Sequence, residues 1–246
     1  IQPEILSPDD ESPTLVLLHE ALGCIAHWRD FPELLARETG LPVLLYDRCG
    51  FGGSQPLEVT RGMNYHEREV ASLHDLLNAC AVKRPILFGH SDGATIALLY
   101  ASAFPQRPLA VISEAAHLFV EEETLSGIKS AVELWNTTDF RKRLMHYQGE
   151  HTDRVFSAWT ETWLDPDFRG WSVESRMQTI SCPVLAIQGE DDQFGTERQL
   201  LTICSTVAGP SRRRMIPDCG HSPHREASAE VLEEINEFLE DLLRAA

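Results

Sequence analysis

The sequence predicts an α/β fold, with a mostly parallel sheet covered by helices on both faces and one inserted helical segment. Three observations predict it. Short apolar runs alternate with segments of helical periodicity along most of the chain. Most of these runs are apolar without alternation, which is typical of strands buried on both faces of a parallel sheet. One long interval, between Ser113 and Val184, has no strand-like run at all.

The predicted strands are the short apolar runs, and the predicted helices lie between them. The strands are expected at residues 14–18, 43–46, 86–88, 110–113, 184–188 and 213–216. Helical patterns occupy residues 31–38, 63–79 and 197–207. The last segment places apolar residues on one helical face, so we expect this helix to dock on the sheet. These residues are Val231, Leu232, Ile235, Phe238, Leu239, Leu242 and Leu243.

The strand-free interval predicts a helical cap. Residues 118–179 look helical and are too many for a simple crossover, so we expect them to be inserted in a core formed by residues 1–117 and 180–246. Tryptophans are concentrated there, and two of them, four residues apart, share a helix face. Their rings either attach the cap to the core or line an apolar pocket. Trp135, Trp159 and Trp163 are the candidate substrate-binding residues.

Composition excludes several classes of partner. The chain has 246 residues and a net charge of −17, so it repels phosphate backbones and anionic lipid surfaces. We therefore expect no nucleic-acid and no membrane partner, and we interpret Arg212–Arg214 as solvated surface. No apolar stretch approaches the roughly 20 residues that cross a bilayer. Residues 1–4 lack the pattern of a secretory signal, which favours a cytoplasmic location.

The cysteines indicate neither disulfides nor a metal site. The chain has six, without any Cys-x-x-Cys pair and without histidines at zinc-ligand spacing. We expect free thiols in a reducing compartment, no metal and no cofactor. The six are Cys24, Cys49, Cys80, Cys182, Cys204 and Cys219.

The segment Gly89-His90-Ser91-Asp92-Gly93 carries the strongest chemical signal. It follows a predicted strand directly and begins a predicted helix that has small residues along one face. A turn this sharp strains its central residue and lifts that side chain clear of the sheet. The alternative is a glycine-rich loop with an N-capping serine. The strand before and the helix after favour Ser91 as a nucleophile.

A serine nucleophile needs a base, and a histidine base needs a carboxylate to orient it. Acidic residues follow the predicted strand 184–188, in the segment Gly189-Glu190-Asp191-Asp192. His221 follows the predicted strand 213–216. Loops at the carboxyl edge of a parallel sheet face one crevice. We therefore expect Ser91, an acid near position 192 and His221 to meet there.

The order serine, acid, histidine resembles the α/β-hydrolase superfamily over nearly the whole chain, and residues 46–54 are similar to a structural loop of that superfamily. The resemblance implies an α/β-hydrolase fold with an inserted helical cap. It assigns the acid to Asp192, with Asp191 as runner-up, and the base to His221, with His224 as its neighbour. Some members carry the acid at the position of Glu114 instead. The compact cap suggests the branch of small-molecule esterases, carbon–carbon bond hydrolases and valacyclovir-hydrolase-like enzymes.

The resemblance also implies an oxyanion hole formed by two backbone amides. One belongs to Asp92, after the nucleophile, and the other to Ala21, in the segment 19–23. The sequence departs from the family pattern at Glu20, where glycine is common. Two interpretations stay open for the Glu20 and Asp92 carboxylates. They support the loop backbone, or they recognise a cationic group on the substrate.

The sequence thus predicts a serine hydrolase, a carboxylesterase acting on small carboxylic esters through a Ser-His-Asp triad. Cleavage of a carbon–carbon bond in a meta-cleavage product, hydrolysis of lactones or amides, and acyl transfer use the same triad and stay open. A cofactor-free oxygenase or lyase is a further alternative. A small-ligand-binding protein with a hydrolase fold is the alternative outside enzymes. The substrate preference and the oligomeric state, homo-oligomer included, are left open.

Overall fold

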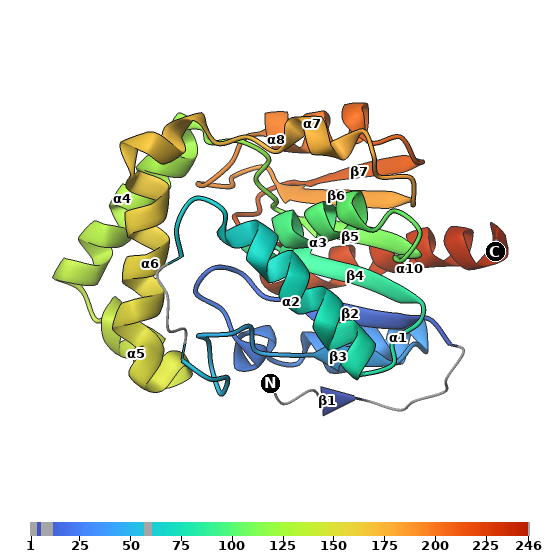
Figure 1. Ribbon diagram of the computed structural model, residues 1–246, viewed down its shortest axis with the longest axis horizontal. Coiled ribbons are helices and arrows are strands. Elements are labelled where there is room, and N and C mark those ends of the chain that lie inside the picture. Colours follow the sequence, from blue (N-terminus) through green and yellow to red (C-terminus); the bar gives the residue numbers. More distant parts are fainter. Residues whose placement is uncertain (1–3, 6–11, 57–60, 246) are drawn as a thin grey trace.

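The computed structural model describes residues 4–5, 12–56 and 61–245. Within them the chain forms a seven-stranded sheet of order β1-β3-β2-β4-β5-β6-β7 (Figure 1). β1 pairs antiparallel with β3, and all the other neighbours are parallel. The strands are β1 (Glu4–Ile5), β2 (Thr14–Leu18), β3 (Val43–Leu45), β4 (Pro85–His90), β5 (Ala110–Glu114), β6 (Val184–Gly189) and β7 (Ser211–Ile216). The predicted mostly parallel sheet is confirmed.

Helices cover both faces of this sheet (Figure 1). α2 and α3 pack together on one face, and α1 and α10 pack together on the other. The helices are α1 (Phe31–Thr39), α2 (Tyr65–Ala79), α3 (Asp92–Ala103), α4 (Glu122–Thr137), α5 (Phe140–Gln148), α6 (Thr152–Leu164), α7 (Glu174–Met177), α8 (Glu197–Thr206), α9 (Pro223–Glu226) and α10 (Ser228–Ala245). Short 3-10 turns are η1 (Ile25–Trp28), η2 (Gly149–His151) and η3 (Pro166–Gly170).

The strands are apolar without alternation because both of their faces are buried. In β2, Val16 and Leu18 belong to the hydrophobic cluster under α2 and α3, whereas Leu15 and Leu17 belong to the cluster under α1 and α10. Successive side chains of a strand point to opposite faces, so an open face would require polar residues at every second position. The edge strand β7 differs, because most of its residues are partly or fully exposed.

Helices α4, α5 and α6 stand together at one end of the sheet, at the left of Figure 1. They share a hydrophobic cluster that also includes Ala21 and Tyr65 from the sheet side. α7 lies within the predicted insertion 118–179, but its main helix contacts are with α3 and α8. The division into a core and an inserted cap stays a prediction. We use the word cap below for α4, α5 and α6.

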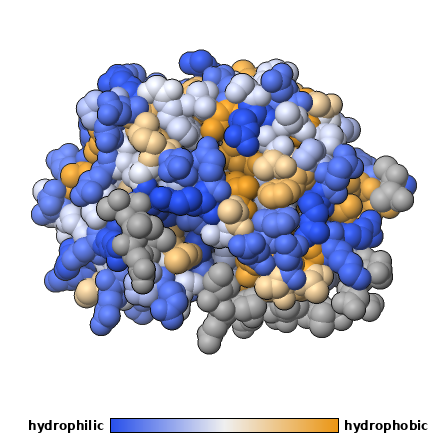
Figure 2. All heavy atoms as spheres, in the orientation of Figure 1, coloured by the Kyte–Doolittle hydropathy of each residue, from blue (hydrophilic) through white to orange (hydrophobic). Residues whose placement is uncertain are grey.

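Polar residues dominate the face of the molecule in Figure 2, with hydrophobic residues near its centre. Arg212 and Arg214, from the basic cluster on β7, pair with Glu234 of α10. The six cysteines carry free thiols. Among the described helices, none has the length and apolarity that crossing a bilayer requires. Residues 1–3, on which the expectation about a secretory signal partly rests, lie outside the described part of the chain.

Candidate active site

Ser91 occupies a strained turn between β4 and α3. Its φ of 53° and ψ of −115° lie in a region that L-residues rarely adopt. The flanking glycines make this turn possible. A Cβ on Gly89 would overlap the backbone of Gly93, and a Cβ on Gly93 would overlap the carbonyl oxygen of Leu18. Strand and helix can therefore approach closely, and the serine hydroxyl stands at the carboxyl edge of the sheet.

The structure brings Ser91, His221 and Asp192 together. The Nε2 atom of His221 lies 2.9 Å from the Oγ atom of Ser91. The Nδ1 atom of His221 lies 2.8 Å from the Oδ1 atom of Asp192. Because an ionised carboxylate only accepts, Nδ1 carries the proton and Nε2 is left to accept from the serine hydroxyl. Three side chains from distant parts of the sequence form one hydrogen-bonded chain.

Asp192 is held in place by its own loop. Its carboxylate accepts from the backbone amide of Phe194 at 2.8 Å and from the side chain of Gln188 at 3.2 Å. Burial alone would raise the pKa of Asp192, but the charge and hydrogen bond of His221 lower it below the ordinary value. Asp191 is exposed, and none of the interactions described for this part of the chain joins it to His221. The runner-up acid is thus not in contact with the base.

Burial and charge act in opposite directions on His221. Burial disfavours the imidazolium, but the Asp192 carboxylate outweighs burial, so the pKa of His221 lies above its ordinary value of 6.5. Such a histidine is a stronger base than a free imidazole. It is suited to take a proton from a serine hydroxyl and to return it later.

The loops that carry Asp192 and His221 touch because Gly189 has no side chain. A Cβ at this position would overlap the carbonyl oxygens of Cys219 and Gly220. The Glu226 carboxylate accepts hydrogen bonds from the backbone amides before and after His221, those of Gly220 at 2.8 Å and Ser222 at 2.9 Å. These bonds hold the backbone on both sides of the base. Glu226 was not among the residues predicted from the sequence. Its offset from His221 on the following helix is a signal that could have suggested it.

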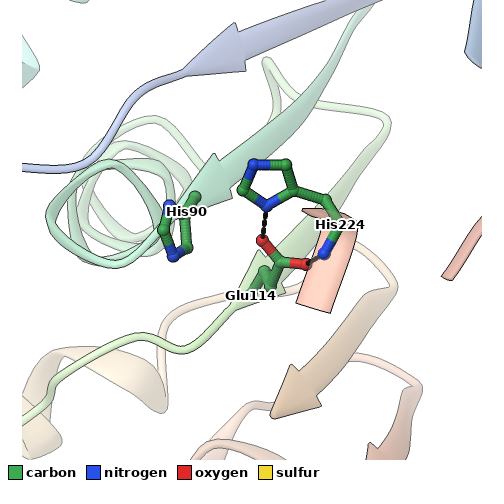
Figure 3. A group of neighbouring side chains, drawn as sticks. All are labelled: His90, Glu114 and His224. Atoms are coloured by element: carbon green, nitrogen blue, oxygen red, sulfur yellow. Dashed lines mark hydrogen bonds and ion pairs between the residues drawn. The ribbon is translucent and has the colours of Figure 1, made fainter. Parts of the chain in front are cut away.

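Glu114 and His224 form a buried pair beside this site (Figure 3). The Glu114 carboxylate accepts from the backbone amide and from the Nδ1 atom of His224, both at 2.6 Å. His90, which precedes the serine, donates from Nε2 to the carbonyl oxygen of His221 at 2.7 Å. The alternative acid therefore contacts His224 rather than His221. Together these side chains anchor the segment that carries His221.

His90, Glu114 and His224 also form the one group of three potential metal ligands found in the described residues. Their candidate ligand atoms lie within 4.8 Å of one another, and all three residues are buried. Both carboxylate oxygens already accept hydrogen bonds from His224. Burial and the neighbouring His224 lower the pKa of His90 to about 4, so this histidine is neutral at pH 7. Because His224 occupies the Glu114 carboxylate and His90 bonds the His221 backbone, we assign no metal or cofactor to this cluster.

The two backbone amides expected at the oxyanion hole flank the serine. Ala21 and Asp92 both line the cavity in front of Ser91. The amide of Asp92 lies at the start of α3, where helix N–H groups have no intrahelical acceptor. None of the hydrogen bonds described for residues 12–56 and 61–245 uses either amide. Neither amide therefore has an acceptor among the described residues, as an oxyanion-hole donor requires.

Glu20 supports the loop that carries Ala21. Its carboxylate accepts from the backbone amide of Leu22 and lies 3.5 Å from the Nδ1 atom of His27. Burial opposes ionisation, but His27 and the backbone amide bring the pKa of Glu20 down to about 2. These contacts show how the loop accommodates a glutamate at position 20, where members of the family commonly have glycine. The carboxylate also lines the cavity, and a role in substrate binding stays a prediction.

The Asp92 carboxylate is engaged in the interior. It lies 2.7 Å from the Nη1 atom of Arg48 and accepts from the hydroxyl of Tyr65 at 2.6 Å. The Nε2 atom of His66 is 3.1 Å away. Burial would raise the pKa of Asp92, but Arg48 and His66 hold it well below the ordinary range. Its described partners are interior side chains instead of the expected loop backbone, and they favour a structural role for this carboxylate.

A cavity of about 420 Å³ opens in front of Ser91, between the sheet edge and the cap. Trp159 and Trp163 line it, as two of the candidate substrate-binding residues. Trp135 does not, because its ring stacks on Phe156 with centroids 3.9 Å apart, within the cap itself. The expectation for Trp135 is therefore corrected. Helical periodicity gives the face of a residue but not which of two apolar neighbours that face meets.

Comparisons with known proteins agree with this architecture. Human serine hydrolase BPHL is 27% identical over 213 residues, covering 82% of this chain and 69% of that protein. A proline iminopeptidase of Lactobacillus helveticus is 21% identical over 274 residues, covering 96% and 92%. The crystal structure of a membrane phospholipase A, a bacterial virulence factor, shares the fold with a TM-score of 0.79 at 20% identity, covering 99% of this chain and 84% of that one. The family model of the alpha/beta hydrolase family matches residues 15–234, so the chain belongs to this family.

Proposed function

We propose that this protein is a serine hydrolase that cleaves small carboxylic esters through an acyl-enzyme. Ser91 is the nucleophile, His221 the general base and acid, and Asp192 the residue that orients His221. The observation that carries the proposal is the chain of contacts of 2.9 Å and 2.8 Å joining these three side chains at the wall of a cavity. Membership of the alpha/beta hydrolase family supports it.

In the first half of the reaction, the Ser91 hydroxyl gives its proton to Nε2 of His221 while Oγ bonds to the ester carbonyl carbon. The carbonyl oxygen becomes an oxyanion and accepts hydrogen bonds from the amides of Ala21 and Asp92. Asp192 stabilises the imidazolium. When the tetrahedral intermediate collapses, the bond to the alcohol breaks and His221 returns the proton to the departing alkoxide.

In the second half, water replaces the alcohol. His221 takes a proton from this water, whose oxygen bonds to the acyl carbon of the ester formed on Ser91. The same two amides hold the second oxyanion. The bond to the Ser91 oxygen then breaks, the serine regains its proton from His221, and the carboxylic acid leaves. Every proton is returned, and no external cofactor is required.

The size and lining of the cavity support a small substrate with an apolar part. Its volume of about 420 Å³ is within the range of small-molecule sites. Side chains of the cap contribute apolar surface, among them Ile128, Ala131 and Trp159. The name of the proline iminopeptidase relative makes amide hydrolysis the alternative to test beside ester hydrolysis.

A hydrolysis panel tests the proposal. Purified wild type and Ser91→Ala are assayed with p-nitrophenyl esters of increasing acyl length, aromatic esters, proline p-nitroanilide and a meta-cleavage diketone. We expect short and medium esters to give the highest kcat/KM. Ser91→Ala should lower kcat by about 10⁶-fold, as loss of a serine nucleophile does elsewhere.

Two results would contradict the proposal. Ester hydrolysis at the same slow rate in wild type and Ser91→Ala would favour a ligand-binding protein. A clear preference for the diketone or for the anilide would keep the three side chains in their roles but replace the ester as the substrate class.

A further inference from the structure

A fully buried arginine, Arg48, lies beneath the two amides of the proposed oxyanion hole. It belongs to the loop after β3, and its side chain has no exposed surface. Taking a guanidinium out of water is costly, and buried ion pairs often stabilise a fold no more than apolar residues of the same volume. Fold stability is therefore a weak explanation for a charge at this place. Its contacts with the residues around Ser91 offer a more specific one.

The first contact fixes the peptide between Glu20 and Ala21. The Nη2 atom of Arg48 donates to the carbonyl oxygen of Glu20 at 3.1 Å. In a trans peptide the C=O and the following N–H point in opposite directions. Holding this oxygen in the interior therefore turns the Ala21 N–H away from Arg48, and Ala21 lines the cavity.

His19 reinforces the same peptide, and Arg48 sets its tautomer. The backbone amide of Arg48 donates to Nε2 of His19 at 3.0 Å, so this nitrogen carries no proton. The proton is on Nδ1, which donates to the Glu20 carbonyl oxygen at 2.9 Å. Burial and the Arg48 charge keep the pKa of His19 well below its ordinary value, so the ring stays neutral. The Arg48 side chain thus bonds the Glu20 carbonyl oxygen directly, and the Arg48 backbone amide orients the His19 ring that bonds the same oxygen.

The second contact fixes the residue after the nucleophile. The Nη1 atom of Arg48 lies 2.7 Å from the Oδ2 atom of Asp92, whose other oxygen is held by Tyr65. Asp92 carries the other amide of the proposed oxyanion hole. One rigid guanidinium therefore contacts both the Glu20–Ala21 peptide and Asp92, which carry the two donors. Arg48 itself is not among the residues that line the cavity.

We propose that Arg48 is a positioning residue that sets the distance and direction of the two oxyanion-hole amides relative to each other. The inference rests on the proposed function and deepens it. Arg48 does not touch substrate in this account. It acts through Asp92 and the Glu20–Ala21 peptide, and misplacing a catalytic group by about 1 Å can cost about 10²-fold in rate.

The test compares Arg48→Met and Arg48→Lys with a matched control, Arg61→Met. Arg61 is a buried cation of the same cluster, 3.7 Å from Oδ2 of Asp92, and the described contacts do not join it to the Glu20 carbonyl. Lysine can reach Asp92 but cannot bridge two acceptors as the guanidinium fork does. If Arg48→Met does not fold, Arg48→Lys and the charge-neutral double variant Arg48→Met with Asp92→Asn take its place.

The measurements separate positioning from general loosening of the fold. For the best ester, we expect Arg48→Met to lower kcat by about 10- to 100-fold, with KM within about 3-fold. Arg48→Lys should lie between this variant and wild type. Affinity for a trifluoromethyl ketone, which bonds to Ser91 and forms a tetrahedral oxyanion, should fall by the same factor as kcat. The acidic limb of the pH profile, set by His221, should not move. Arg61→Met should keep kcat within about 3-fold.

Equal losses of kcat in Arg48→Met and Arg61→Met would overturn the inference, as would unchanged affinity for the trifluoromethyl ketone. These outcomes differ from failure of the proposed function. That failure appears in wild type itself, as turnover and ketone binding that do not depend on Ser91.

Discussion

Two neighbouring histidines beside the serine, His90 and His221, differ in the direction of their pKa shifts because their partners differ. Burial is the largest influence on both. For His221 the Asp192 carboxylate outweighs burial and raises the pKa above 6.5, whereas burial and His224 lower the pKa of His90 to about 4. His221 therefore takes up a proton more readily than a free imidazole does. His90 stays neutral and serves as a fixed donor to the backbone of His221.

The pH profile of the reaction tests this difference at the residue scale. A general base must be unprotonated, so kcat/KM should fall as pH drops through the pKa of His221, with the half-maximal point above pH 6.5. Asp192→Asn removes the anion that raises this pKa. Burial then dominates, and the acidic limb should move to lower pH, while kcat falls by about 10⁴-fold.

Asp191→Asn is the matched control, because it removes a neighbouring but exposed carboxylate. It should leave both kcat and the acidic limb unchanged. Initial rates between pH 5 and pH 9 check both variants. If the limb stays fixed in Asp192→Asn and moves in Glu114→Gln instead, the acid has been misassigned.

The three residues of the proposed triad could be predicted from sequence because each carries a local signal. Ser91 lies between two glycines, and Asp192 and His221 each follow a strand and a glycine. Arg48 and His90 have no comparable signal, and Glu226 has only its offset from His221. Their roles arise from contacts between segments that are distant or on different elements, and only the folded chain supplies these partners.

At the scale of the elements, close approach of strands and loops builds the site. β6 carries Gly189 against the loop that holds His221, and the absence of a side chain brings Asp192 within hydrogen-bonding distance of the base. Gly93 likewise allows α3 to approach β2, because a Cβ at this position would overlap the carbonyl oxygen of Leu18. These positions require glycine because neither has room for a Cβ atom. A substitution can test this.

Gly189→Ala should separate the two loops. The added Cβ would meet the backbone carbonyl oxygens of Cys219 and Gly220, and backbone atoms cannot move aside cheaply. We expect the free energy of unfolding to drop by about 3 kcal/mol, at the upper end of overpacking costs, together with a loss of kcat. Urea denaturation and ester hydrolysis measure the two effects.

Gly170→Ala provides the control for this prediction. A Cβ at Gly170 meets nothing within 4 Å, so this variant should match wild type in stability and activity. Equal behaviour of the two variants would mean that the loops can shift, and that their close approach does not define the site.

Sequence patterns predicted the long elements and the parallel sheet, but they missed β1, and the concentration of tryptophans in the interval 118–179 did not separate Trp135 from the rings that line the cavity. β1 has two residues and exists through antiparallel pairing with β3, which no local pattern announces. Trp135 is partly buried near the C-terminal end of α4, where its ring meets Phe156 of α6 instead of the cavity. Burial is readable from sequence, whereas the choice of partner depends on how the elements pack.

At the scale of the whole molecule, we expect substrate choice to depend on the cavity between the cap and the sheet edge. The sheet side contributes Ser91 and His221 to the cavity, and the cap contributes apolar side chains such as Ala131 and Trp159. Changes in the cap should therefore alter which substrate fits without altering the chemistry. This separation is a property of the assembled molecule, since neither part encloses the cavity alone.

Ala131→Phe tests that separation by filling part of the cavity from α4. Ala131 is buried and lines the cavity, so a phenyl ring there removes room for a long acyl chain. We expect kcat/KM for an octanoyl ester to fall by about 10- to 100-fold, since each excluded methylene contact costs on the order of 1–3 kcal/mol. Hydrolysis of an acetyl ester should change little.

Ser130→Phe is the control, because it adds the same ring to the neighbouring exposed position of α4. Its acyl-length profile should equal that of wild type. Equal losses for acetyl and octanoyl esters in Ala131→Phe would show that the cap acts on the catalytic groups and not on substrate size.

Covalent labelling of the nucleophile tests the central claim most directly. Wild type is incubated with a fluorophosphonate, and the modified residue is located by mass spectrometry of peptides, with Ser91→Ala treated in parallel. The account predicts one phosphonyl group per chain, on Ser91, and none in the variant, with labelling that slows as pH falls below the pKa of His221. A label on another residue, or equal labelling of both proteins, would contradict it.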